Sequence, residues 1–201
     1  MKKRIYISAD YSLSDGDREV VEVLHGWSDN DHLIVNFTDT SQVVSGSVSK
    51  NPDCRYCDLK REFNKQINVS SIVLFVIGDK TAARTAGSLC RRMTDGASCL
   101  CTPYKQNANG SSYCKYPNVC KADPDGDIGY INNFSYLEHE FREAKKLKKQ
   151  IVIVYNAINR QPTWLPAYMS GYEDIAIPFW KSNSWYGKSG NYELIKQQLG
   201  F

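Results

Sequence analysis

The sequence lacks any run of apolar residues close to the roughly 20 that a membrane-spanning helix needs. Its first residues, MKKRIYISADYS, are basic but become polar at Ser8, before an apolar stretch long enough for a signal peptide. We therefore expect a cytoplasmic protein with no membrane partner.

An excess of charge of one sign is also missing. The 201 residues include 25 Lys and Arg against 22 Asp and Glu, which gives a formal net charge of +3. Basic residues cluster only at Lys2–Arg4 and Lys145–Lys149, and no basic stripe carries interleaved aromatic residues. A nucleic-acid partner is therefore not expected. No internal repeat is present, and a hydrophobic content of 42% is that of an ordinary globular protein.

What the chain does contain is an alternation of β-rich runs and amphipathic helical patterns. The β-rich runs lie within residues 4–8, 32–40, 71–81 and 150–157, and helical patterns cover 17–27, 58–71, 134–149 and 191–199. Asp15 or Asp17 is available to cap the first helix, and Asp58 the second. The continuous apolar run 72–77 is typical of a parallel strand covered on both faces. This order predicts an α/β fold with a parallel sheet and helices on both faces.

Residues 86–133 interrupt the alternation with a segment that lacks sustained periodicity and holds five cysteines and five glycines. Cys54 and Cys57 have the spacing of a zinc knuckle, and further ligands could come from Cys99, Cys101, Cys114 and Cys120. We expect free thiols in a reducing compartment. Structural zinc is the first alternative and disulfides are the second.

One carboxylate falls on the packed face of the helix at 134–149. At about 100° per residue, Glu140 lies within the face formed by Leu137, Phe141 and Ala144. Glu138 and Glu143 lie more than a right angle from its centre, so we expect them to face water. A buried carboxylate needs a partner, protonation or a ligand-lined cleft. The start of this helix borders the carboxyl ends of the strands, where ligands bind in such folds. The alternative is an edge glutamate paired with a nearby Lys or Arg.

Three segments carry a family resemblance. They are RIYISADYS, in which a hydrophobic strand ends at a Ser; DLKREFNKQINVSSIVLFVIGDKTAART, a helix and strand ending in IG-x-x-T; and SYLEHEFREAKKLKKQIVIVY, a helix with an aromatic-x-x-x-Glu pattern. They resemble TIR-like domains, nearest to the ThsB family of Thoeris antiphage defence. The resemblance covers about 1–85 and 134–160. The chain departs from the family in the 48 residues from Ala86 to Asn133, and in having Tyr136 where Trp is commoner.

The resemblance implies a single flavodoxin-like, TIR-like domain over 1–201, with 86–133 as a Cys-rich insertion. It also implies cleavage of the nicotinamide–ribose bond of NAD, with or without cyclisation, and Glu140 as the catalytic residue. No cofactor beyond the NAD substrate is implied. The strand-end residues that we expect to line the substrate cleft, each otherwise ordinary turn chemistry, are Ser8, Ala9, Asp10, Tyr11, Asp39, Gly78, Asp79 and Thr81, with Tyr136 at the helix start.

We expect a signalling role in antiphage or stress defence, with self-association through TIR surfaces and a downstream effector that binds the nucleotide product. Two other functions remain open. One is a non-catalytic TIR-like module for protein interaction or nucleotide sensing. The other is a nucleoside deoxyribosyltransferase, which also places a glutamate at a ribose. Among the tail aromatics Trp164, Phe179, Trp180 and Trp185, we expect at least two in the core.

Overall fold

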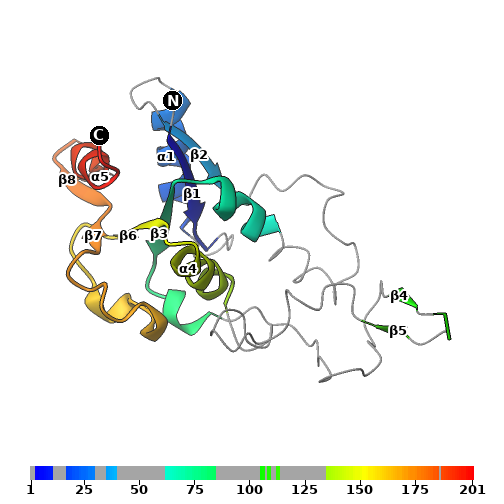
Figure 1. The fold of residues 1–201 in the computed structure, drawn as a ribbon. Helices are drawn as coiled ribbons and strands as arrows, with labels where there is room; N and C mark the ends of the chain where they lie inside the picture. Colours follow the sequence, from blue (N-terminus) through cyan, green and yellow to red (C-terminus); the bar gives the residue numbers. More distant parts are fainter. Residues whose placement is uncertain are drawn as a thin grey trace.

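Five parallel strands form the central sheet of the protein, in the order β2-β1-β3-β6-β7 (Figure 1). They are β1 (Lys3–Ser8), β2 (Val35–Asp39), β3 (Ile72–Ile77), β6 (Gln150–Tyr155) and β7 (Ile177–Pro178). This computed structural model describes residues 3–10, 17–29, 35–39, 62–84, 105–106, 108–109, 112–113, 135–185 and 187–201. The expected parallel, flavodoxin-like α/β fold is confirmed.

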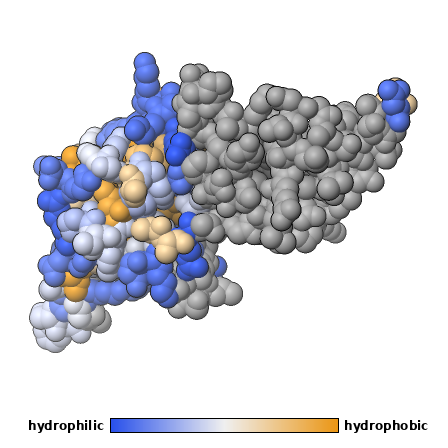
Figure 2. Space-filling view, turned by 90° about the horizontal axis from the view of Figure 1, so that it is seen from below, coloured by the Kyte–Doolittle hydropathy of each residue, from blue (hydrophilic) through white to orange (hydrophobic). Residues whose placement is uncertain are grey.

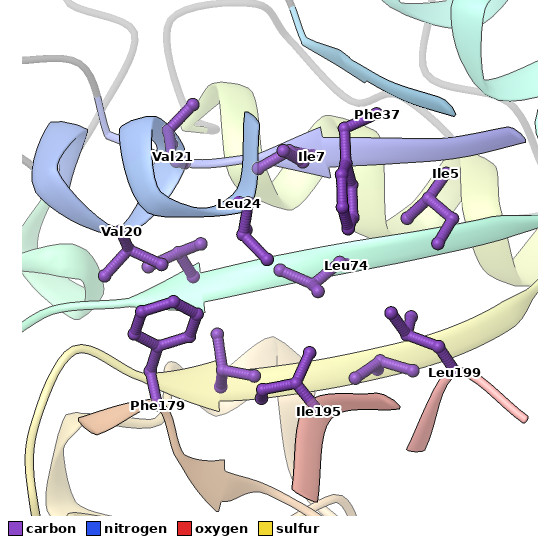
Figure 3. Packing of buried hydrophobic residues seen from close by; sticks show 14 of the residues in the cluster. Ile5, Ile7, Val20, Val21, Leu24, Phe37, Leu74, Phe179, Ile195 and Leu199 are labelled. Atoms are coloured by element: carbon purple, nitrogen blue, oxygen red, sulfur yellow. The ribbon is translucent and has the colours of Figure 1, made fainter. Parts of the chain in front are cut away.

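Helices cover both faces of this sheet, as the continuous apolar strand β3 predicts. On one face lie α1 (Arg18–Asp29) and α5 (Tyr192–Gln198). Their buried residues Leu24 and Ile195, and the nearby Leu199, belong to one apolar cluster with Ile5, Ile7 and Leu74 of the sheet (Figure 3). On the other lie a helix over 62–69 and α4 (Tyr136–Lys146). Their residues Phe63, Ile67, Leu137 and Phe141 pack with Tyr6, Phe75 and Tyr155. All six residues of β3 are buried between these two layers.

The ends of α4 are set by local sequence. The Ser135 side chain accepts a hydrogen bond from the Glu138 amide at 3.0 Å, which caps the first turn. At the other end Lys148 has a positive φ of 50°. The amides of Lys148 and Lys149 donate back to the carbonyls of Lys145 and Ala144, both at 3.0 Å. This is the Schellman arrangement, in which glycine is the residue usually found at the left-handed position.

The chain after β6 adds structure that periodicity does not indicate. Two 3₁₀ turns, η2 (Pro162–Trp164) and η3 (Ala167–Met169), precede the short edge strand β7. A hairpin of β8 (Trp180–Asn183) and β9 (Gly187–Gly190) then leads into α5. Phe179 and Trp180 are buried, which confirms that at least two of the tail aromatics belong to the core. Trp185, at the hairpin tip, is 88% exposed.

Little of the Cys-rich insertion falls within the described residues. The parts that do are residues 108–109 and a small antiparallel pair, β4 (Lys105–Gln106) and β5 (Ser112–Tyr113). The six candidate zinc ligands, Tyr11, Asp15 and Asp58 lie outside the described residues, so those predictions stay predictions. Among the described residues, no helix is long and apolar enough to cross a membrane.

The described surface is mainly hydrophilic. Apolar residues show on one face as small separate areas among hydrophilic and neutral ones (Figure 2). The large exposed hydrophobic residues of the described part are distributed over several elements: Val69, Ile158, Ile175, Trp185 and Phe201.

Candidate active site

Glu140 lies in the first half of α4 and is only 3% exposed. In the crossover from β3 to β6 the start of this helix meets the carboxyl end of the sheet, and the side chain of Glu140 reaches the end of β1. The prediction that this carboxylate sits on the packed face is confirmed. The alternative of an edge glutamate paired with a nearby Lys or Arg stays open, but a position at the edge of the packed face does not fit the burial of this residue.

Two hydroxyl groups of β1 hold the Glu140 carboxylate. The Tyr6 hydroxyl donates to Oε1 at 2.7 Å, and the Ser8 hydroxyl donates to Oε2. Tyr6 and Ser8 are two residues apart on one strand, so their side chains lie on the same face of the sheet. One donor for each oxygen is an arrangement that an ionised carboxylate accepts. Two side chains of the sheet therefore orient the carboxylate.

The two glutamates of α4 that we expect to face water differ in burial. Glu138 is partly exposed and its carboxylate lies 2.6 Å from the Arg142 guanidinium, one helical turn on. Glu143 is 8% exposed, so the prediction that it faces water is wrong. The reason is that the helix over 62–69 also covers this side of α4: His139, one turn before Glu143, is buried with its Nε2 2.7 Å from Asn64 Oδ1.

The residues predicted to line a cleft after β1 are only partly brought to Glu140. Ser8 contacts it directly, and Ala9 is buried immediately after the strand. The carboxylate of Asp10 instead pairs with Arg84, whose Nε lies 2.7 Å from Asp10 Oδ2. This ion pair links the chain after β1 to the chain after β3. Asp10 therefore lies at the carboxyl ends of the strands, in an ion pair with a cation from the segment that follows the neighbouring strand β3.

The end of β3 forms a tight turn. The Gly78 amide donates to the Thr81 hydroxyl at 2.8 Å, and both residues are buried, whereas Asp79 is exposed. Tyr136, at the start of α4, packs edge-to-face on Phe63 with ring centroids 5.5 Å apart. Asp39 ends β2 and pairs in register with Ile7, which places its backbone at the same edge of the sheet.

A second buried carboxyl group, Asp17, lies at this edge and was not among the predicted site residues. Asp17 directly precedes α1, and its carbonyl accepts hydrogen bonds from the first-turn amides of Val20 and Val21. Its side chain accepts from Asn156 Nδ2 at 2.8 Å, and Asn156 Oδ1 accepts from the Trp180 indole at 2.6 Å. Burial raises the pKa of Asp17 from 3.8 to about 6, although the Asn156 hydrogen bond opposes this shift.

Tyrosine hydroxyl groups add to the polarity of the α4 side. Burial raises the pKa of Tyr168, with added repulsion from Glu138 and Glu140, while the nearby Ser135 hydroxyl opposes the shift. Burial likewise raises the pKa of Tyr155. Both phenols are therefore neutral at physiological pH, and the hydroxyl of Tyr155 has no hydrogen-bond partner among the residues that the structure describes.

Sequence reasoning missed Tyr6, Asp17, Arg84 and Asn156. Tyr6 had a usable signal, because a phenol inside an otherwise apolar strand needs a hydrogen-bond partner. Asn156 also had one, since it is the first residue after β6 and so lies at the strand ends. Arg84 and Asp17 carried no such signal, because their contacts depend on which segments after the strands lie side by side in the fold.

The described residues contain no group of three or more His, Cys, Asp or Glu side chains arranged to hold a metal ion. The site is thus built from one carboxylate with two hydroxyl donors on one face of the sheet, and a buried Asp-Asn-Trp chain at the same edge. Comparison with family models, curated proteins and solved structures finds no match for this chain.

Proposed function

We propose that the protein is a TIR-type NAD glycohydrolase or cyclase in which Glu140 is the catalytic carboxylate. The observation that carries the proposal is the burial of Glu140 at the carboxyl ends of the strands, with both oxygens bonded to hydroxyl groups of β1. A carboxylate in a protein interior is costly. A ligand that develops positive charge beside it is one reason to keep it there.

The chemistry suits a single carboxylate. The bond that breaks joins ribose C1′ to the pyridinium nitrogen, and nicotinamide leaves as a neutral group, so the leaving group needs no general acid. Positive charge then develops on the ribose, as in glycoside hydrolysis. In hydrolysis, water forms the new C1′–O bond and one proton is released, giving ADP-ribose. In cyclisation, a nucleophile of the same molecule takes the place of water.

Burial strengthens the contribution of Glu140, since a fixed charge in a water-poor site stabilises developing charge more than it would in bulk water. Tyr6 and Ser8 orient the carboxylate and hold it still. A carboxylate has about four lone-pair sites for hydrogen bonds, so in this scheme Glu140 also positions ribose hydroxyls. Tyr6 and Ser8 are positioning residues in this scheme, and Glu140 is the catalytic one.

The test is incubation of concentrated protein with NAD, followed by chromatography with mass detection. We expect nicotinamide together with ADP-ribose or a cyclic ADP-ribose. The two products differ in mass by one water, because hydrolysis adds a water molecule and cyclisation does not. Nicotinamide release without either product, or no loss of NAD in the presence of a crowding agent, would contradict the proposal.

The same assay separates the other functions. A deoxyribosyltransferase acts on nucleosides through a covalent glycosyl–enzyme intermediate, so intact-protein mass spectrometry would show an added deoxyribosyl group after incubation with a deoxynucleoside. An interaction module would leave both NAD and deoxynucleosides unchanged.

We further propose that activity depends on self-association, with the product bound by a downstream effector. Specific activity should then rise with protein concentration, which a dilution series from micromolar to nanomolar measures. A protein that remains monomeric and turns over NAD with the same specific activity at nanomolar concentration would refute this part.

A further inference from the structure

Asp17 is the second buried carboxyl group at the carboxyl edge of the sheet, and the proposed reaction does not use it. Its side chain is on the α1 side of the sheet, whereas Glu140 reaches the edge from the α4 side. Asp17 is 2% exposed, and its backbone and side chain contact the residues that follow three of the strands.

Each contact ties a different strand end to this residue. The Asp17 amide donates to the Asp10 carbonyl, two residues after β1, at 2.7 Å. Its carboxyl oxygen accepts from Asn156, the first residue after β6. Gly78, the first residue after β3, lies so close that a Cβ on it would be 2.7 Å from Asp17 Oδ1. The exits of β1, β3 and β6 therefore meet at one residue, through its backbone for β1 and its side chain for β3 and β6.

Two of the residues held in this way are predicted to line the substrate cleft. Asp10 and Gly78 both belong to that set, and Gly78 is in turn bonded to Thr81, a third member. A shift of the Asp17 carboxyl group toward Gly78 would therefore press on the backbone of this turn, because Gly78 has no side chain to absorb the shift.

We propose that Asp17 is a positioning residue that holds the exits of β1, β3 and β6 together, and that its ionisation changes this hold and thereby the cleft. That the cleft receives the anionic diphosphate of NAD rests on the proposed function. The geometry points to this role because the backbone and side chain of Asp17 together contact all three exits.

The charges around Asp17 make its ionisation sensitive near neutral pH. Burial is the largest cause of its raised pKa, and the like charges of Asp10 and Asp79 add to it, while hydrogen bonds from the Asn156 side chain and the Asp10 backbone oppose it. Arg84 pairs with Asp10. Arg18 and Glu19, which follow Asp17 at the start of α1, are exposed. The Lys188 ammonium group of β9 donates a hydrogen bond to the Glu19 carboxylate. The β6 and β8 sides present the neutral groups of Asn156 and Trp180.

Nuclear magnetic resonance of the ligand-free protein tests the positioning role without reference to activity. The Trp180 indole N–H donates to Asn156, and Asn156 donates to Asp17. The resonance of the indole proton should therefore respond to the ionisation of Asp17 through Asn156. We expect the Trp180 indole, the Asp17 amide and the Gly78 amide to shift together with a midpoint near the Asp17 pKa of about 6. In Asp17→Asn these shifts should vanish.

Two further variants keep the test decisive if Asp17→Asn does not fold. In Asn156→Ala the Trp180 indole should stop titrating while the Gly78 amide continues to titrate, because only the first is linked through Asn156. Trp185→Phe, on the exposed tip of the same hairpin, should titrate as the wild type does. If the Gly78 amide does not follow Asp17, or if the shifts persist in Asp17→Asn, the proposal is overturned.

Turnover of NAD by the same proteins separates this proposal from the proposed function. Ionised Asp17 adds negative charge beside Asp10 and Asp79, so we expect the KM for NAD to rise as pH increases through 6, and this rise to be absent in Asp17→Asn. An unchanged KM profile in an active Asp17→Asn variant would refute the link to the cleft. No turnover by the wild type would refute the proposed function, while the resonance titration would still decide the positioning role.

Discussion

Replacing Asp17 by Asn should change how the stability of the protein depends on pH. The substitution keeps an oxygen that can accept the Asn156 hydrogen bond, and removes the carboxyl group that must ionise inside the protein. Burial raises the folded-state pKa of Asp17 from 3.8 to about 6. Because the folded state binds this proton more tightly than the unfolded state, the stabilisation is complete below pH 3.8 and is lost as pH rises to about 6.

The shift in the Asp17 pKa determines how much the difference in unfolding free energy between the two proteins should change with pH. A difference of about 2 units corresponds to about 3 kcal/mol of unfolding free energy between the acid and neutral limits, of which about 2 kcal/mol falls between pH 4.5 and 7.5. The free energy of unfolding of Asp17→Asn, relative to that of the wild type, should therefore increase by about 2 kcal/mol as pH rises over this range. Urea unfolding followed by circular dichroism at several pH values measures the difference.

Comparing the two proteins at each pH cancels the titration of all other groups. Glu22→Gln, on the exposed face of the same helix, is the matched control and should differ from the wild type by less than about 0.5 kcal/mol throughout. A stability difference between Asp17→Asn and the wild type that is the same at pH 4.5 and 7.5 would refute the raised pKa of this carboxyl group.

Five other substitutions, two contrasting pairs and one single change, can be tested by thermal or urea unfolding. Gly78→Ala places a Cβ 2.7 Å from Asp17 Oδ1 and should cost about 1–3 kcal/mol, whereas Gly26→Ala, with nothing within 4 Å of its Cβ in α1, should stabilise by about 0.5–1 kcal/mol. Tyr6→Phe removes a donor from Glu140 and should cost about 1–3 kcal/mol, but Tyr155→Phe should cost little. Lys148→Gly relieves a left-handed backbone and should stabilise by about 1 kcal/mol. Equal effects within either pair, or destabilisation by Lys148→Gly, would contradict these contacts.

The central strands could be predicted from sequence because their signal is local. Residues 72–77 are apolar without interruption, and a strand buried on both faces needs that pattern. Glu140 could be placed in the same way, since helical geometry alone puts it on the face of Leu137 and Phe141. The short strand β7 could not, because two residues are too few to show a period.

The contacts that shape the site depend on distant segments. Glu143 was wrongly expected in water because the helix over 62–69 covers that side of α4, and the pattern within α4 carries no sign of it. Asp17 looked like an ordinary helix cap, and only the parallel order of β1, β3 and β6 brings Asn156 and Gly78 to it. Topology, and not local pattern, created that cluster.

The most direct measurement is the rate of nicotinamide release from NAD by wild-type protein, Glu140→Gln and Glu143→Gln at one high protein concentration. Glu143 is a second buried carboxylate one turn along α4, so its replacement controls for the loss of a buried charge on this helix. We expect Glu140→Gln to lower the rate by at least about 100-fold, with Glu143→Gln close to the wild type if it folds equally well. Equal rates in the wild type and Glu140→Gln would contradict the central claim that this carboxylate stabilises the reacting ribose.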